Sequence, residues 1–132
     1  MARRPSRRRA SRRDRARPLG RALGGPLTLG IHRGDLWWAD VPGDKRRPVL
    51  VLTRERFIPR LTAVLVAPVT TTVRGIPTEV RMGPADGMPQ PCAANFDNMF
   101  TLASGRFAQR ITALPSTRLE DVCEAYRFAA EC

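Results

Sequence analysis

The stretch "RPVLVLTR", residues 47–54, decides the fold class of this sequence. A proline separates the basic run Lys45–Arg47 from four consecutive apolar residues, Val49–Leu52. Neighbouring side chains of a strand point to opposite faces, so such a run is apolar on both faces. A short apolar run of this kind is typical of a fully buried strand. We therefore predict a buried strand over 47–53 that carries arginines at its start.

The sequence around this strand predicts several more strands and one helix. Runs rich in β-branched and aromatic residues, bounded by glycine and proline, favour strands. They cover 34–41, 61–72, 77–82, 92–103 (one strand or a bent pair) and 110–114. A helix follows from Pro115, with Thr117 and Glu120 at capping-box spacing. Its apolar stripe comprises Leu119, Val122, Cys123, Tyr126 and Ala130. We expect a mainly β (α+β) fold, a small twisted barrel of mostly antiparallel strands with a C-terminal helix.

The net charge of +11 is concentrated at the N-terminus. Residues 1–30 hold ten arginines and one acid, which gives +9, whereas residues 31–132 hold 13 bases and 11 acids, which gives +2. The segment 1–30 has no aromatic residue and little apolar surface to bury, so we predict that it is disordered. We favour an extension without a role, and an RNA-binding arm or a targeting peptide are the alternatives. Residues 31–132 then form a single domain.

Several classes of protein are disfavoured by what the sequence lacks. No apolar run approaches the roughly 20 residues that a membrane span requires. The three cysteines, Cys92, Cys123 and Cys132, are far apart and odd in number, which argues against a disulfide framework or a zinc site and favours the cytoplasm. The acids of the domain are scattered, so we predict neither a metal ion nor another cofactor.

One rim of the predicted sheet gathers residues that suit a phosphodiester. If strands 47–53 and 64–70 pair antiparallel, as sequential strands commonly do, Arg47 lies beside Thr70. A guanidinium forks onto phosphate oxygens, and hydroxyl groups supply further donors. The alternative is that Arg47 only pairs with Asp44 or Asp97, and that the threonines merely end a strand. The other candidates at this rim are Arg46, Thr71, Thr72 and Arg74.

Four segments in a fixed order resemble the MazF/PemK-like toxins of bacterial type II toxin–antitoxin systems. They are "RGDLWWADV", "KRRPVLVLTR", "VAPVTTTVRGIPTEV" and "FDNMFTL", and the resemblance covers about residues 31–130. It implies an SH3-like barrel with a C-terminal helix, a homodimer, and an endoribonuclease that cuts single-stranded RNA at short sequences. It also implies a small antitoxin whose flexible C-terminal segment lies across the RNA groove.

The resemblance also implies which residues form the site. The catalytic arginine is the one before the proline, Arg47, and the catalytic threonine closes the A-P-V-T segment, at Thr70. The acidic–amide pair that helps to hold RNA falls on Asp97 and Asn98. The loop "PGDKR" is shorter than in many members, so the cut sequence is not transferred.

The adjacent residues Trp37 and Trp38 must point to opposite faces of the first strand. We expect one of them in the core. The other is a second core contact or an anchor for the antitoxin or for a second subunit, because tryptophan is enriched at the centres of interfaces.

A metal-free mechanism suits these residues because RNA carries its own nucleophile, the 2′-hydroxyl. Arg47 would stabilise charge on the phosphoryl oxygens, and Thr70 would orient the phosphate. The products would be a 2′,3′-cyclic phosphate and a 5′-hydroxyl end. His32 starts the domain and is expected to be a surface residue, whereas Asp97 is either a general base or a structural carboxylate.

Two alternative functions stay open at this point. The first is a non-enzymatic toxin of the same barrel fold, of the gyrase-poison type, which acts through a C-terminal helix with an exposed aromatic end. The chain ends "RFAAEC" instead. The second alternative is an RNA-binding barrel without catalytic activity.

We expect residues 1 to about 28 to be dispensable for folding and for RNA cleavage, because of their composition and their absence from the family pattern. Any contribution to RNA binding should come from phosphate contacts and should fade as salt rises. Thermal unfolding and cleavage at low and high salt, measured on the truncated chain, check this. A truncated protein that does not fold, or that loses cleavage at high salt, would contradict the prediction.

Overall fold

The computed structural model describes residues 30–130, which form strands, short 3-10 helices and one α-helix. The strands are β1 (Asp35–Asp40), β2 (Arg46–Val51), β3 (Ala63–Thr70), β4 (Glu79–Met82), β5 (Cys92–Asn95), β6 (Phe100–Ala103) and β7 (Phe107–Ala113). The 3-10 helices are η1 (Glu55–Arg60), η2 (Pro84–Asp86), η3 (Phe96–Asn98), η4 (Ser104–Arg106) and η5 (Ser116–Arg118), and α1 is Leu119–Ala130. The predicted extension, residues 1–30, lies outside the described residues except for Gly30, so its disorder stays a prediction.

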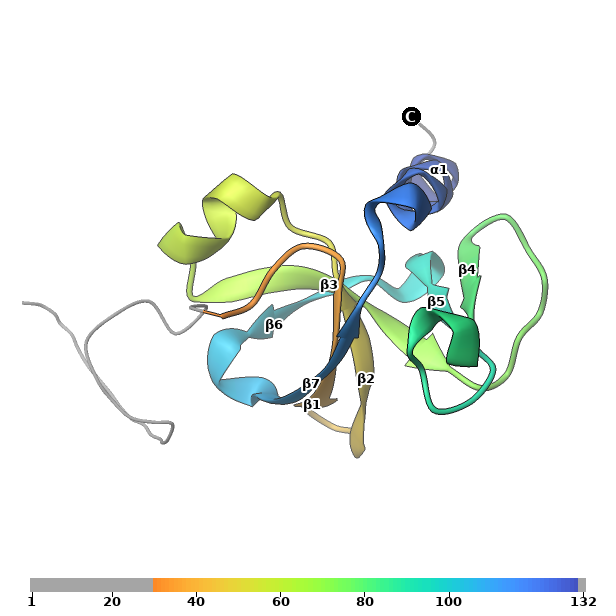
Figure 1. Ribbon diagram of the computed structural model, residues 1–132. Helices are drawn as coiled ribbons and strands as arrows, with labels where there is room; N and C mark the ends of the chain where they lie inside the picture. Colours follow the sequence, from red (N-terminus) through yellow and green to blue (C-terminus); the bar gives the residue numbers. More distant parts are fainter. Residues whose placement is uncertain (1–29, 131–132) are drawn as a thin grey trace, which may run out of the picture.

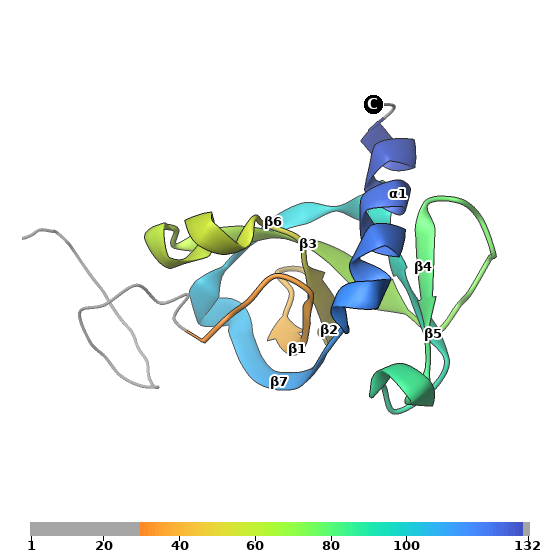
Figure 2. The ribbon, with the colours of Figure 1, turned by 45° about the horizontal axis from the view of Figure 1, so that its top comes forward.

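Five strands curl into a small antiparallel barrel (Figures 1 and 2). The order of pairing is β6, β3, β2, β1 and β7. Strands β6 and β7 are consecutive in the chain, and the single turn of η4 joins them and completes the ring. The predicted antiparallel barrel with a C-terminal helix is therefore confirmed, with a covalent turn where a fully closed barrel would have a further strand pair.

Strand β3 belongs to two sheets at once. Its first half pairs with β6, and its last residues pair with β5, which in turn pairs with β4. Pro68 lies where the partner changes, between Val66, opposite Phe100, and Val69, opposite Ala94. Proline has no backbone N–H to donate, so it suits a position where the pairing on one edge is interrupted. The region 92–103 is the bent pair of strands, with η3 at the bend.

The apolar run of β2 is explained by a core on both of its faces. Leu50 belongs to one buried cluster, which also contains Phe96 and the helix residues Val122 and Ala125. Val49 and Val51 belong to a second cluster on the opposite face. Burial on both faces favours a strand that is apolar throughout, because each face loses contact with water. The chain therefore covers both faces of β2 by itself.

The start of the C-terminal helix differs from the prediction. The helical turns begin at Ser116, so Thr117 lies inside them and the predicted capping box does not form at this position. Arg118 anchors this end instead: its guanidinium donates to Asp121 at 2.8 Å, to Asp86 at 2.6 Å and to the carbonyl of Arg81 at 2.7 Å. These contacts tie the helix to strand β4 and to the η2 turn.

The apolar stripe of α1 is shifted from the predicted one. Val122 and Ala125 are buried, and Leu119 and Ala129 pack against them. The predicted members Tyr126 and Ala130 are exposed, because the buried face is centred on the row that Val122, Ala125 and Ala129 form. Tyr126 is instead part of the surface.

Candidate functional site

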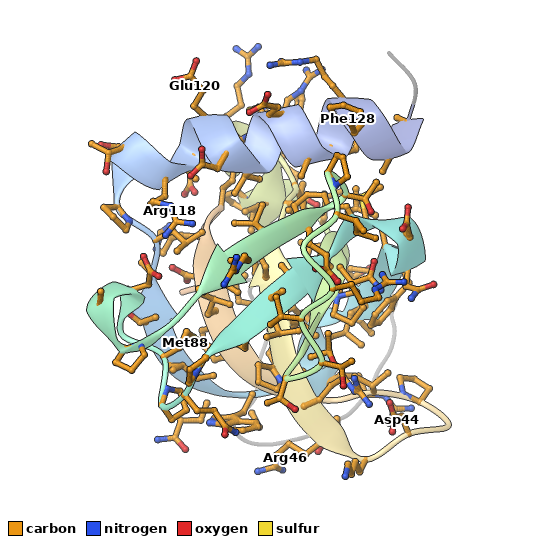
Figure 3. All side chains as sticks on the ribbon, turned by 90° about the vertical axis from the view of Figure 1, so that its right-hand side faces the viewer. Asp44, Arg46, Met88, Arg118, Glu120 and Phe128 are labelled. Atoms are coloured by element: carbon orange, nitrogen blue, oxygen red, sulfur yellow. The ribbon has the colours of Figure 1, made fainter. Side chains whose placement is uncertain are left out.

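The backbone brings Arg47 and Thr70 to one end of the sheet. Strands β2 and β3 pair with Val49 opposite Pro68 and Leu50 opposite Ala67. The same register, continued toward the start of β2, sets Arg47 across from Thr70. This is the arrangement that the antiparallel pairing predicted. Figure 3 shows the neighbouring residues Asp44 and Arg46 at the end of the sheet that is farthest from α1.

Arg47 is partly buried and is held by a carboxylate of its own turn. Its Nη2 lies 2.8 Å from Oδ2 of Asp44, and 30% of its side chain is exposed. Among the described residues, its buried Nε has no hydrogen-bond partner. Asp44 and Asp97 were the two alternative partners of Arg47, and in the structure Arg47 pairs with Asp44.

The turn between β1 and β2 fixes the position of Asp44. Its Oδ1 accepts a hydrogen bond of 2.7 Å from the backbone N–H of Lys45, and its own N–H donates to the carbonyl of Val41 at 3.0 Å. Gly43 has φ +77°, a conformation that side chains other than glycine rarely adopt. The carboxylate is therefore oriented by the turn and not only by Arg47.

Arg46 points to the other face of β2 and has a separate partner. It lies opposite Asp40 of β1 and binds both oxygens of that carboxylate, with Nε–Oδ1 at 2.9 Å and Nη2–Oδ2 at 3.3 Å. The hydrogen bond from Arg46 lowers the pKa of Asp40 below its usual value. Arg46 therefore contacts its carboxylate partner through two nitrogen atoms, whereas Arg47 contacts Asp44 through one.

Thr70 ends β3 with a hydroxyl group that is ready to donate. Its Oγ1 accepts a hydrogen bond of 3.0 Å from the backbone N–H of Thr72. A hydroxyl oxygen that accepts one hydrogen bond keeps its own proton for another acceptor. Thr70 is half-buried, and Thr71 and Thr72 are exposed.

Arg74 is committed to the loop that follows β3. Its Nε donates to Oε2 of Glu79 at 3.1 Å, and the backbone N–H groups of Arg74 and Gly75 both donate to Oε1 at 3.0 Å. The loop is thus folded around the carboxylate of Glu79. Arg74 remains a candidate RNA contact only through the exposed part of its side chain.

Asp97 and Asn98 lie in η3, away from the level of Thr70. Thr70 pairs with Ala93, and β5 runs from there toward the middle of β3 before η3 begins. Asp97 accepts a hydrogen bond of 2.8 Å from the hydroxyl of Thr78, and its N–H is capped by Asn95 at 2.9 Å. The pair is exposed, but the register does not bring it beside Arg47.

The two tryptophans have different environments. Trp37 packs against the second core cluster, meets Phe107 edge-to-face at 5.7 Å and donates its indole N–H to the buried Asp35 at 3.1 Å. It is the core contact that we expected of one of the pair. Trp38 lies on the opposite face of β1, across from Pro48, and is half-buried.

His32 lies at the far end of the barrel from Arg47. Its Nδ1 is 2.7 Å from Oε2 of Glu55, and both side chains are largely exposed. The hydrogen bond with Glu55 raises the pKa of His32. The N–H of Gly34, two residues after His32, donates to the carbonyl of Val51 at the end of β2, so His32 lies far from the start of β2.

A groove that the sequence did not reveal lies between η1 and α1. Its volume is about 1,080 Å³. The exposed apolar residues Phe57, Leu61 and Tyr126 line it, together with arginines that include Arg60 and Arg127. The sequence signal for this groove is the aromatic residue Phe57 in the segment "RERFIPRL", residues 54–61, which lies between two predicted strands.

Two further observations concern the described residues as a whole. Over residues 30–130 no three His, Cys, Asp or Glu side chains gather closely enough to hold a metal ion. No helix in the described part of the chain is long and apolar enough to span a membrane.

The fold and the rim define a small barrel with an arginine and a threonine presented at one end of a rigid sheet. Residues 32–129 match the model of the PemK-like, MazF-like toxins of type II toxin–antitoxin systems. The chain therefore belongs to this family.

Individual relatives agree with this assignment. The chain is 39% identical over 107 residues to the probable endoribonuclease MazF5 of Mycobacterium tuberculosis, which covers 80% of this chain and 98% of that protein. It is 41% identical over 103 residues to the probable endoribonuclease MazF2 of the same organism, with 77% and 100% covered. The solved structure of the M. tuberculosis toxin MazF-mt6 superimposes with a TM-score of 0.69 at 39% identity, covering 74% of this chain and 96% of that one. A mycobacterial endoribonuclease in complex with its cognate antitoxin superimposes with a TM-score of 0.68 at 25% identity, covering 76% and 94%.

Proposed function

We propose that this chain is a toxin endoribonuclease that cleaves single-stranded RNA at short sequences without a metal ion. The observation that carries the proposal is the register that sets Arg47 across from Thr70 at the end of a buried sheet. Two relatives of the chain, MazF5 and MazF2 of M. tuberculosis, are named probable endoribonucleases, which supports the reaction class. The buried strands give these two side chains a rigid mount, which preorganised catalysis requires.

The reaction uses the 2′-hydroxyl of RNA as the nucleophile. This oxygen loses its proton and attacks the adjacent phosphorus, and the bond to the 5′-oxygen breaks as that oxygen takes up a proton. The products are a 2′,3′-cyclic phosphate and a 5′-hydroxyl end. Arg47 stabilises the negative charge that grows on the phosphoryl oxygens. An arginine guanidinium stays positively charged at any physiological pH, so Arg47 carries its charge throughout the reaction.

Thr70 has a positioning role in this mechanism. Its Oγ1 is oriented by the N–H of Thr72, so its proton points away from that contact. From there it can donate to a phosphoryl oxygen while Arg47 holds another. The exposed Thr71, Thr72, Arg74, Asp97 and Asn98 are the further candidates for contact with RNA.

We expect the purified protein to cut a long single-stranded RNA in the presence of excess EDTA. The downstream fragments should carry 5′-hydroxyl ends, which a polynucleotide kinase labels without prior phosphatase treatment. The same assay separates the enzyme from a non-enzymatic toxin and from an inactive RNA-binding barrel. Cleavage that stops when chelator is added, or downstream fragments that carry 5′-phosphates, would contradict the metal-independent mechanism.

The partner of the toxin is an antitoxin, a small protein with a flexible C-terminal segment. A related endoribonuclease has been solved with its cognate antitoxin, which supports this assignment. Trp38 is the tryptophan that we assign to contact with the antitoxin, because Trp37 is engaged in the core. We place the protein in the cytoplasm, where cysteines such as Cys92 and Cys123 stay reduced.

We expect the chain to form a homodimer through the groove between η1 and α1. Exposed Phe57, Leu61 and Tyr126 line this groove, and an apolar surface of this kind marks an interface. Light scattering at micromolar concentration should give the mass of two chains. A monomer under these conditions would count against the dimer.

Two substitutions on α1 test the surface that is used. Tyr126 and Phe128 are both exposed, but only Tyr126 lines the groove. Tyr126→Glu should shift the mass toward one chain, because the new charge would be buried between subunits. Phe128→Glu, which places the same charge two residues away on another side of the helix, should leave the mass of two chains. The opposite result would assign the interface to the other side of α1.

A further inference from the structure

The ion pair between Arg47 and Asp44 leaves a hydrogen-bond donor of the guanidinium without an acceptor among the described residues. The contact between the two side chains joins Nη2 of Arg47 to Oδ2 of Asp44, and Oδ1 of Asp44 accepts from the N–H of Lys45. A guanidinium has five N–H donors, and the buried Nε of Arg47 has no partner among the described residues. A buried donor without an acceptor costs free energy. An anion that accepts more hydrogen bonds from Arg47 could therefore displace Asp44.

A phosphodiester is such an anion. Its two non-bridging oxygens match the planar fork of a guanidinium, which can bind them through two parallel N–H groups. Exchange of Asp44 for a phosphate would replace a single contact with two, and rotation of the side chain would give Nε an acceptor. Both partners are partly exposed, at 30% and 39%, so the exchange needs no unfolding. An ion pair at such exposure is weak and is easily displaced.

The neighbouring pair of Arg46 and Asp40 has the opposite character. It already uses both carboxylate oxygens, with contacts of 2.9 and 3.3 Å, and it bridges two strands on the other face. A phosphate would gain no additional contact by replacing Asp40. The two adjacent arginines thus form one satisfied pair and one unsatisfied pair.

We propose that Asp44 occupies Arg47 in the RNA-free protein and is displaced by the scissile phosphate, so that it acts as a built-in competitor for the phosphate. This inference rests on the proposed role of Arg47 in cleavage. Its consequence is that a phosphate alone binds weakly at this rim. The remaining free energy of displacement must come from contacts to the rest of the RNA, which disfavours non-specific binding of the backbone.

The test compares Asp44→Asn with Asp40→Asn. Both substitutions remove one negative charge near the same rim, so their long-range electrostatic effects are matched. An asparagine at position 44 can still accept from the N–H of Lys45 through its carbonyl oxygen, so the turn is retained. Its amide, however, can present N–H donors toward Arg47 where the carboxylate presented an acceptor.

The probe is an oligoribonucleotide with the cut sequence mapped on a long RNA, carrying a 2′-deoxynucleotide in place of the nucleotide that supplies the nucleophile. Asp44→Asn should bind this probe about 3- to 10-fold more tightly than Asp40→Asn, because a competing ion pair of about 1 kcal/mol is lost. The single-turnover rate at saturating cleavable RNA should stay within about 3-fold of the unsubstituted protein, since the phosphate has replaced Asp44 by then.

A second comparison isolates the role of Arg47. In an Arg47→Ala background there is no guanidinium to release, so Asp44→Asn and Asp40→Asn should bind the probe equally. In protein that retains Arg47, equal binding of the probe by Asp44→Asn and Asp40→Asn would overturn the proposal. So would a larger fall in the saturated rate of Asp44→Asn, because it would mean that Asp44 holds Arg47 in place during the reaction. If Arg47→Ala itself cleaves normally, the catalytic assignment fails first, and this outcome is separate from the other two.

Discussion

Replacement of Arg47 by alanine is expected to lower the rate of RNA cleavage about 100- to 1,000-fold, by analogy with the loss of one donor from an oxyanion hole. In the proposed mechanism, the guanidinium donors of Arg47 face the phosphoryl oxygens on which charge grows. The fold should persist, because Arg47 is only partly buried and Asp44 keeps its contact with Lys45. Single-turnover cleavage and thermal unfolding of the same preparation measure both effects.

Two further substitutions sharpen this result. Arg47→Lys should be nearly as damaging as alanine, because an ammonium group keeps the charge but cannot fork onto two oxygens. Arg46→Ala is the control: it removes the same charge one residue earlier, but from a side chain that points to the other face and binds Asp40. It should cause a clearly smaller loss. Equal damage at the two positions would show that the assigned site is wrong.

The register of this site could be predicted because strong physical constraints act on few residues. The run Val49–Leu52 is apolar on both faces, and the structure buries both faces in separate clusters. A strand of this kind belongs inside the fold beside its sequence neighbours, because both of its faces must be covered. The antiparallel pairing of β2 with β3 then sets Arg47 across from Thr70 without further information.

The short irregular segments could not be predicted in the same way. Helix η1 has no periodicity to reveal it, and only one of its residues, Ile58, is buried. The start of α1 depends on Arg118, whose partners Asp86 and Arg81 are distant in the sequence. Two hydrogen bonds to the neighbouring hairpin, and a third to Asp121 within α1, outweigh the local capping box. The position of Tyr126 on the surface follows from the same docking of the helix.

The partner of Arg47 illustrates a choice that spacing leaves open. The sequence left both Asp44 and Asp97 as possible partners of Arg47, because each carboxylate could have reached the rim. The β1–β2 turn decides between them, because it fixes Asp44 through Lys45 and Val41. Asp97 is held instead by Thr78, at another level of the sheet. The resemblance to the family named Asp97 and Asn98 but carried no information about their distance from Arg47.

Substitution of Thr70 should separate the role of its hydroxyl from the role of its shape. Thr70→Val keeps the branched shape at the end of β3 but removes the hydroxyl, so we expect a fall in cleavage rate on the order of 100-fold. Thr70→Ser keeps the hydroxyl, which can still accept from the N–H of Thr72, and should cost less than about 10-fold. Comparable losses in the two variants would mean that packing at this position, and not hydrogen bonding to phosphate, matters for cleavage.

The combination of Arg47→Ala with Thr70→Val tests whether the two side chains act on one phosphate. If they act independently, their losses multiply, and the double variant should fall by roughly 10,000- to 100,000-fold. If they grip the same phosphate, loss of either one already lets the phosphate leave the productive position. The second substitution then removes little more, as observed for catalytic groups that work as a unit. We expect the double variant to cleave within about 3-fold of Arg47→Ala, measured in single-turnover assays in EDTA, because the register of β2 and β3 sets both residues at the same point of the rim.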